Sequence, residues 1–104
     1  MSNRYRPPIT IRRTERHGKI HLAAFIPAQL IYTIEIDPAD LSHRADGEPL
    51  LADWKRLIAG RLAAAIDADY AQTPWMRPSD EDLFLPMDQL ADRMLAKLQR
   101  QEAR

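Results

Sequence analysis

The sequence contains no cysteine, and this absence excludes several kinds of protein. Without cysteine there is no disulfide framework, no cysteine-ligated zinc finger and no thiol nucleophile. Glycine is also scarce, with three residues in 104, and none of them belongs to a GxxxxGKS/T or GxGxxG phosphate loop. HExxH and GxSxG motifs are missing too. We therefore expect a protein that is not an enzyme and that needs no cofactor or metal ion.

An excess of charge of either sign is also missing, because 15 Lys and Arg residues balance 15 Asp and Glu residues. A neutral sum excludes the overall basic character of many nucleic-acid-binding domains. The charges are nevertheless segregated along the chain. Residues 1–21 carry six basic and one acidic side chain, whereas residues 22–54 carry one basic and six acidic ones. The sequence therefore predicts a basic N-terminal region beside acidic connections.

Long hydrophobic runs are absent. The longest stretch without a charged residue spans residues 20–34 and is interrupted by Pro27 and Gln29. A membrane-spanning helix needs about 20 apolar residues, and the first ten residues lack the apolar core of a secretory signal. We expect a cytoplasmic protein with no membrane contact. The length predicts one domain over residues 9–104, preceded by a flexible arm over residues 1–8.

Residues 9–36 show the apolar–polar alternation that is typical of strands. We expect strands over residues 9–14, 19–26 and 30–36, with Leu30, Tyr32 and Ile34 facing the core. Gly18 can adopt positive φ and marks a tight turn between the first two strands. The break at Pro27 either separates two strands or is a bulge in one long, bent strand. We favour three antiparallel strands that form a meander.

The hydrophobic period lengthens to three and four residues after Leu50, which predicts an amphipathic helix of about five turns. Asp37 and Pro38 predict a short helical turn before it. A second helix is expected from Met87, and its apolar stripe covers the sheet or, alternatively, a second copy of the chain. The fold class is therefore α+β: a small three-stranded antiparallel sheet followed by two amphipathic helices packed on one face.

A basic hairpin is the first candidate binding site. An antiparallel ribbon fits the major groove of DNA, and arginine there contacts phosphates or guanine edges. The same charges suit an acidic protein surface, or they form only the solvated face of an edge hairpin. No aromatic residue interleaves with the arginines in the sequence, which argues against binding of single strands. The candidate residues are Arg12, Arg13, Arg16, His17 and Lys19, with His21 beside them.

Trp75, Met76 and Arg77 lie between Pro74 and Pro78 and form the second candidate site. Trp, Met and Arg are enriched in protein interfaces, and a proline-stiffened loop loses little entropy when it docks. The alternative is that Trp75 or Met76 closes the end of the core. We expect this alternative, because large aromatic side chains are usually well buried.

Three further groups contain residues that ligate metals or act as acids, but a structural role explains each of them better. His17 and His21 flank a predicted turn. Asp37, Asp40 and His43 fall on a capped helical turn. Acidic residues 80–82 and Asp88 precede or begin the last helix, where carboxylates complement the helix dipole. We therefore predict no metal site at these positions.

These observations predict a small interaction protein that binds another macromolecule, with a protein as the favoured partner. The chain is rich in arginine and alanine, which is typical of GC-rich bacterial or phage genomes. A narrower form of the hypothesis is an inhibitor of a host defence complex, encoded by a phage or mobile element. The alternative is a nucleic-acid-binding regulator that uses the basic hairpin. A homodimer through the last helix also remains open.

Overall fold

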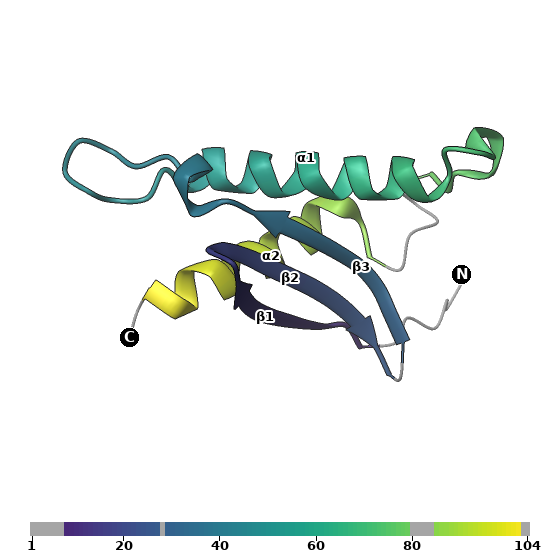
Figure 1. Ribbon diagram of the computed structural model, residues 1–104, viewed down its shortest axis with the longest axis horizontal. Coiled ribbons are helices and arrows are strands. Elements are labelled where there is room, and N and C mark those ends of the chain that lie inside the picture. The colour runs from purple at the N-terminus through teal and green to yellow at the C-terminus, as the bar shows by residue number, and fades with distance from the viewer. Residues whose placement is uncertain (1–7, 28, 80–84, 103–104) are drawn as a thin grey trace, which may run out of the picture.

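The computed structural model describes residues 8–27, 29–79 and 85–102 and contains one sheet and two long helices (Figure 1). The three strands are antiparallel in the order β1-β2-β3, so the predicted meander and α+β fold class are confirmed. None of the helices in these ranges has the length and hydrophobicity needed to cross a membrane. The elements are β1 (Thr10–Arg16), β2 (Lys19–Ile26), β3 (Gln29–Ile36), η1 (Pro38–Asp40), α1 (Leu51–Asp69), η2 (Pro74–Met76) and α2 (Met87–Glu102).

Two residues with left-handed backbone conformations make the turn between β1 and β2. His17 has φ 55° and Gly18 has φ 75°. Two positive φ angles are typical of the two-residue hairpin turn whose twist matches that of the strands. The turn places Arg16 opposite Lys19 and fixes the register of the whole hairpin.

A β-bulge in the second hairpin corrects one sequence-based expectation. The register between β2 and β3 shifts at Ala24 and Phe25, so that Ile31 is left as the extra residue. Ile31 packs against the core, whereas Leu30 turns outward and is 52% exposed. Leu30 was predicted to face the core with Tyr32, but a one-residue insertion reverses the faces of the residues beyond it.

Two helices bury the inner face of the sheet. Helix α1 packs against β3, helix α2 packs against β1, and the helices contact each other. The apolar stripe of α2 is buried in this way, with Leu90, Met94 and Leu98 at most 1% exposed. Their burial makes the chain's own sheet the partner of this stripe. The core comprises Ile11, Ile20, Leu22, Ala24, Ile34, Ile36, Leu41, Trp54, Ile58, Leu62, Leu90, Ala91, Met94 and Leu98.

The other face of the sheet carries no helix within the described ranges, because α1 and α2 lie on the same side (Figure 1). We call it the open face. Its side chains alternate with the core residues along each strand, as the two-residue period of a strand requires. They are Thr10, Arg12, Thr14, Arg16, Lys19, His21, Ala23, Phe25, Leu30, Thr33 and Glu35.

Polar contacts attach the connecting segments to this core. Asp37 accepts a hydrogen bond from the backbone N–H of Ala39 and caps η1, as the sequence predicts. The indole Nε1 of Trp54 donates to the carbonyl of Ser42 at 2.7 Å, and the ring of His43 meets the indole edge to face. The loop before α1 is thereby fixed to the helix that follows it.

Arg13 ties β1 to the end of α2. Its side chain points to the helix side of the sheet and is 10% exposed. Nη1 donates to the carbonyl of Leu98 at 3.1 Å, and Nη2 forms an ion pair with Glu15 at 3.0 Å. The contact places a positive charge beside a carbonyl near the C-terminal end of the helix, where positive charge is favourable.

We predict that the neighbouring arginines differ in their effect on stability. Arg13→Ala lowers the free energy of unfolding by about 1–2 kcal/mol, because it removes a charged hydrogen-bond donor from a largely buried position. Arg12→Ala, on the open face, is the matched control and lowers it by at most about 0.5–1 kcal/mol. Urea unfolding of both variants checks this, and equal losses would contradict the assignment of the two residues to opposite faces.

Candidate macromolecule-binding surfaces

The residues of the predicted basic hairpin do not form one patch. Arg12 and Arg16 lie on the open face and are exposed, whereas Arg13 lies on the covered face and contacts α2. His17 is exposed at the tip of the turn. Lys19 is on the open face but holds a partner of its own, Asp37. Strand alternation therefore separates cations that are adjacent in the sequence.

Arg12 stacks on an aromatic ring from the neighbouring strand. Its guanidinium carbon lies 4.9 Å from the centre of the Phe25 ring. In the hairpin register Arg12 faces Ala23, so Phe25 is its diagonal neighbour on the same face. Local sequence patterns do not indicate this pair, because Phe25 is 13 positions away from Arg12. Counting back from the His17–Gly18 turn identifies it.

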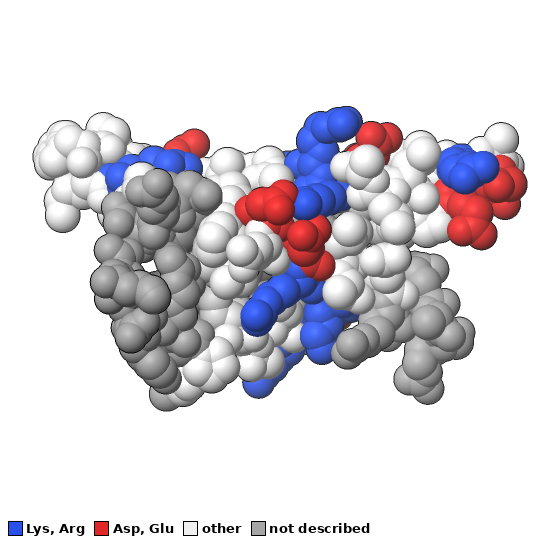
Figure 2. All heavy atoms as spheres, turned by 180° about the vertical axis from the view of Figure 1, so that it is seen from behind, with Lys and Arg blue, Asp and Glu red and all other residues white. Residues whose placement is uncertain are grey.

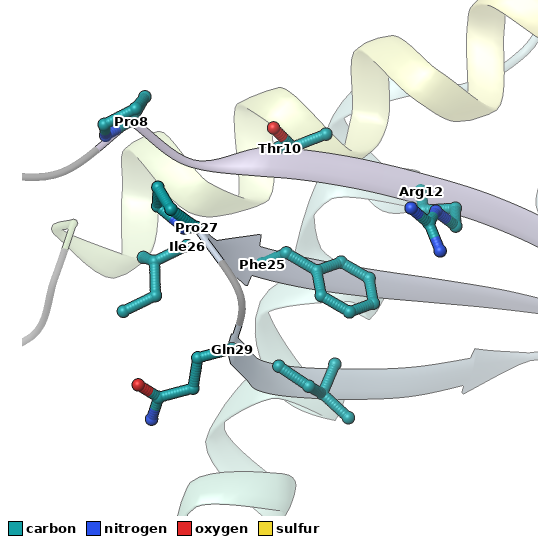
Figure 3. A pocket seen from close by; sticks show the side chains of 8 residues that line it. Pro8, Thr10, Arg12, Phe25, Ile26, Pro27 and Gln29 are labelled. Carbon is teal, nitrogen blue, oxygen red and sulfur yellow. The ribbon is translucent and has the colours of Figure 1, made fainter.

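An open hollow of about 420 Å³ adjoins this pair (Figure 3). Phe25 and Leu30 form part of its apolar wall, while Thr10, Arg12 and Gln29 contribute polar groups. The hollow exists because the bulge turns Leu30 outward beside Phe25. An apolar hollow with a few polar groups at its margin is the usual form of a site for a small planar ligand group. The lining residues are Pro8, Thr10, Arg12, Phe25, Ile26, Pro27, Gln29 and Leu30.

Lys19 and Asp37 form an ion pair at the far end of the open face. Their Nζ and Oδ2 atoms are 2.9 Å apart. The hydrogen bond to Asp37 raises the pKa of Lys19, and the hydrogen bond from Lys19 lowers the pKa of Asp37. Lys19 therefore stabilises the start of η1, and its charge is already neutralised.

The residues weighed as metal ligands have separate contacts. His21 faces Glu35 at 3.5 Å, Asp37 pairs with Lys19, and Asp40 lies 3.6 Å from Arg61. Asp88 belongs to a bridge in which Lys55 of α1 contacts Asp88 and Asp92 of α2. In the described ranges no three His, Asp or Glu side chains come together as a metal site requires. Residues 80–82 lie outside the described part of the chain.

The Trp75 loop departs from expectation. Trp75 is 78% exposed and Met76 is 62% exposed, so neither closes the core. The core beneath α1 is already filled, with Trp54, Ile58, Leu62 and Ile66 all at most 1% exposed. We call Trp75 and Met76 the apolar tip. This end of the molecule lies at the upper left of Figure 2. Its outermost part is white, that is, without charged side chains, and the charged side chains near the end of α1 lie next to it.

The apolar tip is held in place from its base. Residues 74–76 form the turn η2, in which the N–H of Met76 donates to the carbonyl of Thr73 at 2.8 Å. Arg77 then forms an ion pair with Asp67 on the last turn of α1. These contacts fix the backbone on both sides of Trp75 and leave its indole in solvent.

Comparisons with protein-family models, with curated proteins and with solved structures find no match to this chain.

The Lys19–Asp37 pair predicts a specific dependence of stability on pH. The folded-state pKa of Asp37 lies below its ordinary value, so its charge stabilises the fold above that ordinary value. The contribution disappears as the pH falls through the lowered pKa, below about pH 4. Asp37→Asn keeps the capping oxygen and removes the charge. We expect a smaller loss of unfolding free energy between pH 7 and pH 3 in this variant than in the wild type.

Urea unfolding at both pH values measures this difference. Asp69→Asn is the matched control, because among the described residues Asp69 has no ion-pair partner. An identical pH dependence of the wild type and Asp37→Asn would show that the ion pair does not contribute.

Proposed function

We propose that this protein is a non-enzymatic interaction module that binds a partner protein through the apolar tip. The observation that supports this most directly is the 78% exposure of Trp75 beside Met76, which is 62% exposed. An indole in solvent contributes nothing to folding by burial, yet it offers a large apolar surface to a partner. Trp is among the residues that most often dominate the binding energy of protein interfaces.

The fixed geometry of the tip favours tight docking. The turn η2 begins at Pro74, and the Arg77–Asp67 ion pair restrains its end. A pre-ordered loop loses less conformational entropy when it binds than a flexible one does. Because the charges of Arg77 and Asp67 neutralise each other, we expect the partner to offer an uncharged apolar pocket for the indole. Met76 can adapt to an irregular pocket wall.

An inhibitor of a larger complex, such as a phage-encoded inhibitor of a host defence complex, suits a 104-residue chain without catalytic motifs. We place its action in the cytoplasm, because the chain has no cysteine for the disulfides that many small exported domains use.

We predict that Trp75→Ser weakens partner binding about 30-fold or more without affecting the fold. Truncation of a central interface tryptophan costs about 2–4 kcal/mol of binding energy, a loss of affinity of about 30-fold or more. The experiment captures proteins from nuclease-treated bacterial lysate on the wild type, identifies them by mass spectrometry, and titrates the purified partner against each variant.

Leu51→Ser is the matched control, because Leu51 is also an exposed apolar side chain, at 38%, but lies at the opposite end of α1. Protection of Trp75 fluorescence from iodide by the bound partner gives an independent readout. Trp54, which is 1% exposed, contributes little to that quenching. A partner retained equally by Trp75→Ser would refute the proposed site.

A further inference from the structure

The cations of this protein fall into two groups. Seven of the basic residues with described side chains have a carboxylate within ion-pair distance: Arg13, Lys19, Arg44, Lys55, Arg56, Arg61 and Arg77. Four have none among the described residues: Arg12, Arg16, Arg93 and Lys97. All four of these belong to β1 or α2, which pack against each other. The unpaired positive charge is therefore concentrated at one edge of the molecule.

Where their side chains are described, the acidic residues of the same two elements are already engaged. Glu15 of β1 is paired with Arg13, and both Asp88 and Asp92 of α2 are paired with Lys55. Among the described side chains, these ion pairs leave the positive charge of Arg12, Arg16, Arg93 and Lys97 without a carboxylate partner, although the whole chain is neutral. In Figure 2 blue side chains gather in the lower middle of this view, where α2 and β1 lie, below the central red side chains.

The four unpaired cations lie on both sides of β1. Arg12 and Arg16 are on the open face, whereas Arg93 and Lys97 project from α2 beside the start of the strand. Arg93 donates one hydrogen bond to the carbonyl of Ile9, and its other N–H groups have no further partner within residues 8–27, 29–79 and 85–102. Thr10 lines both the hollow beside Phe25 and the hollow beside Arg93 and Lys97. A ligand that passes Thr10 therefore reaches cations on both sides of the strand.

We propose that the β1–α2 edge and the adjoining hollow bind single-stranded nucleic acid. Phosphates would contact the four unpaired cations, and one base would occupy the hollow against Phe25 and the guanidinium of Arg12. Proteins bind single strands in this way, by combining a positive track for the backbone with aromatic or guanidinium planes on which bases stack. This site is separate from the apolar tip and does not depend on the function proposed for it.

The geometry favours a single strand over the other polyanions. A duplex is stiff over about 150 base pairs and resists the sharp bend that would bring it to cations on both sides of one strand. The Asp and Glu side chains of an acidic protein segment provide charge, but they carry no ring that could pack against Phe25 and Arg12, whose guanidinium carbon lies 4.9 Å from the centre of the Phe25 ring. The apolar wall from Phe25 and Leu30 suits a base better than it suits a carboxylate.

The test is fluorescence anisotropy with labelled oligo(dT) and oligo(rU) of about 12 nucleotides, within the site sizes known for single-strand binders. We expect binding that weakens with salt, because it releases counterions from the phosphates. Phe25→Leu, which retains an apolar side chain, and Arg12→Ala each weaken binding about tenfold. Lys97→Gln reduces the slope of log K against log salt by about 0.7, the amount expected for the loss of one phosphate contact.

Arg56→Ala is the matched control, because it removes an exposed cation of α1 that is paired with Asp53, and it leaves binding unchanged. A dissociation constant weaker than about 100 µM for both oligonucleotides, which is weaker than typical non-specific binding, would overturn the proposal. Equal weakening by Arg56→Ala would also overturn it, as would competition by polyglutamate or tighter binding of a duplex. We expect Trp75→Ser to leave oligonucleotide binding unchanged. The result for this site is therefore independent of the result for the apolar tip.

Discussion

Burial of the inner face of the sheet by α1 and α2 determines which side chains remain available for binding. A strand presents alternate residues to opposite faces. Side chains that face the helices, such as Leu22 and Ala24 of β2, are buried in the core and contribute to folding. Apolar burial of this kind is the dominant favourable term in folding. Because both helices lie on one side, none of the described helices covers the other face of the sheet, and Trp75 and Met76 are exposed beyond the C-terminal end of α1.

Charged side chains are divided in a similar way. Lys55 joins the two helices by contacting Asp88 and Asp92, and Arg13 joins β1 to the end of α2. These residues support the packing of the helices on the sheet. The cations that lack a carboxylate partner within the described ranges all belong to β1 and α2, on either side of Thr10. Separate residues therefore maintain the fold and form the surfaces to which we assign binding.

The order of elements could be predicted from the sequence, because each element carries a strong local signal. Period-two alternation defines the strands, Gly18 marks the hairpin turn, and the change of period after Leu50 marks α1. The outward position of Leu30 could not be predicted. It depends on a bulge opposite Ala24 and Phe25, and both registers give an alternating pattern in the sequence alone.

The candidate sites were predicted less completely, because exposure depends on how the core is filled. The exposure of Trp75 depends on the turn η2 and on the ion pair between Arg77 and Asp67, and the local sequence pattern indicates neither. The separation of Arg12 from Arg13 follows from strand alternation and could be predicted from the sequence. The Arg12–Phe25 stack required the exact cross-strand register, and the relation of Arg93 and Lys97 to β1 required the packing of α2.

The central claim is that the proposed binding side chains are dispensable for folding. Urea unfolding of a double variant, Arg16→Ala with Trp75→Ser, tests it most directly. We predict that the unfolding free energy of the double variant lies within about 1 kcal/mol of the wild-type value, as is usual for exposed positions. A loss of about 3–5 kcal/mol, the cost of truncating a buried tryptophan, would contradict it. Such a loss would mean that Trp75 belongs to the core, and the apolar tip would then not be a binding surface.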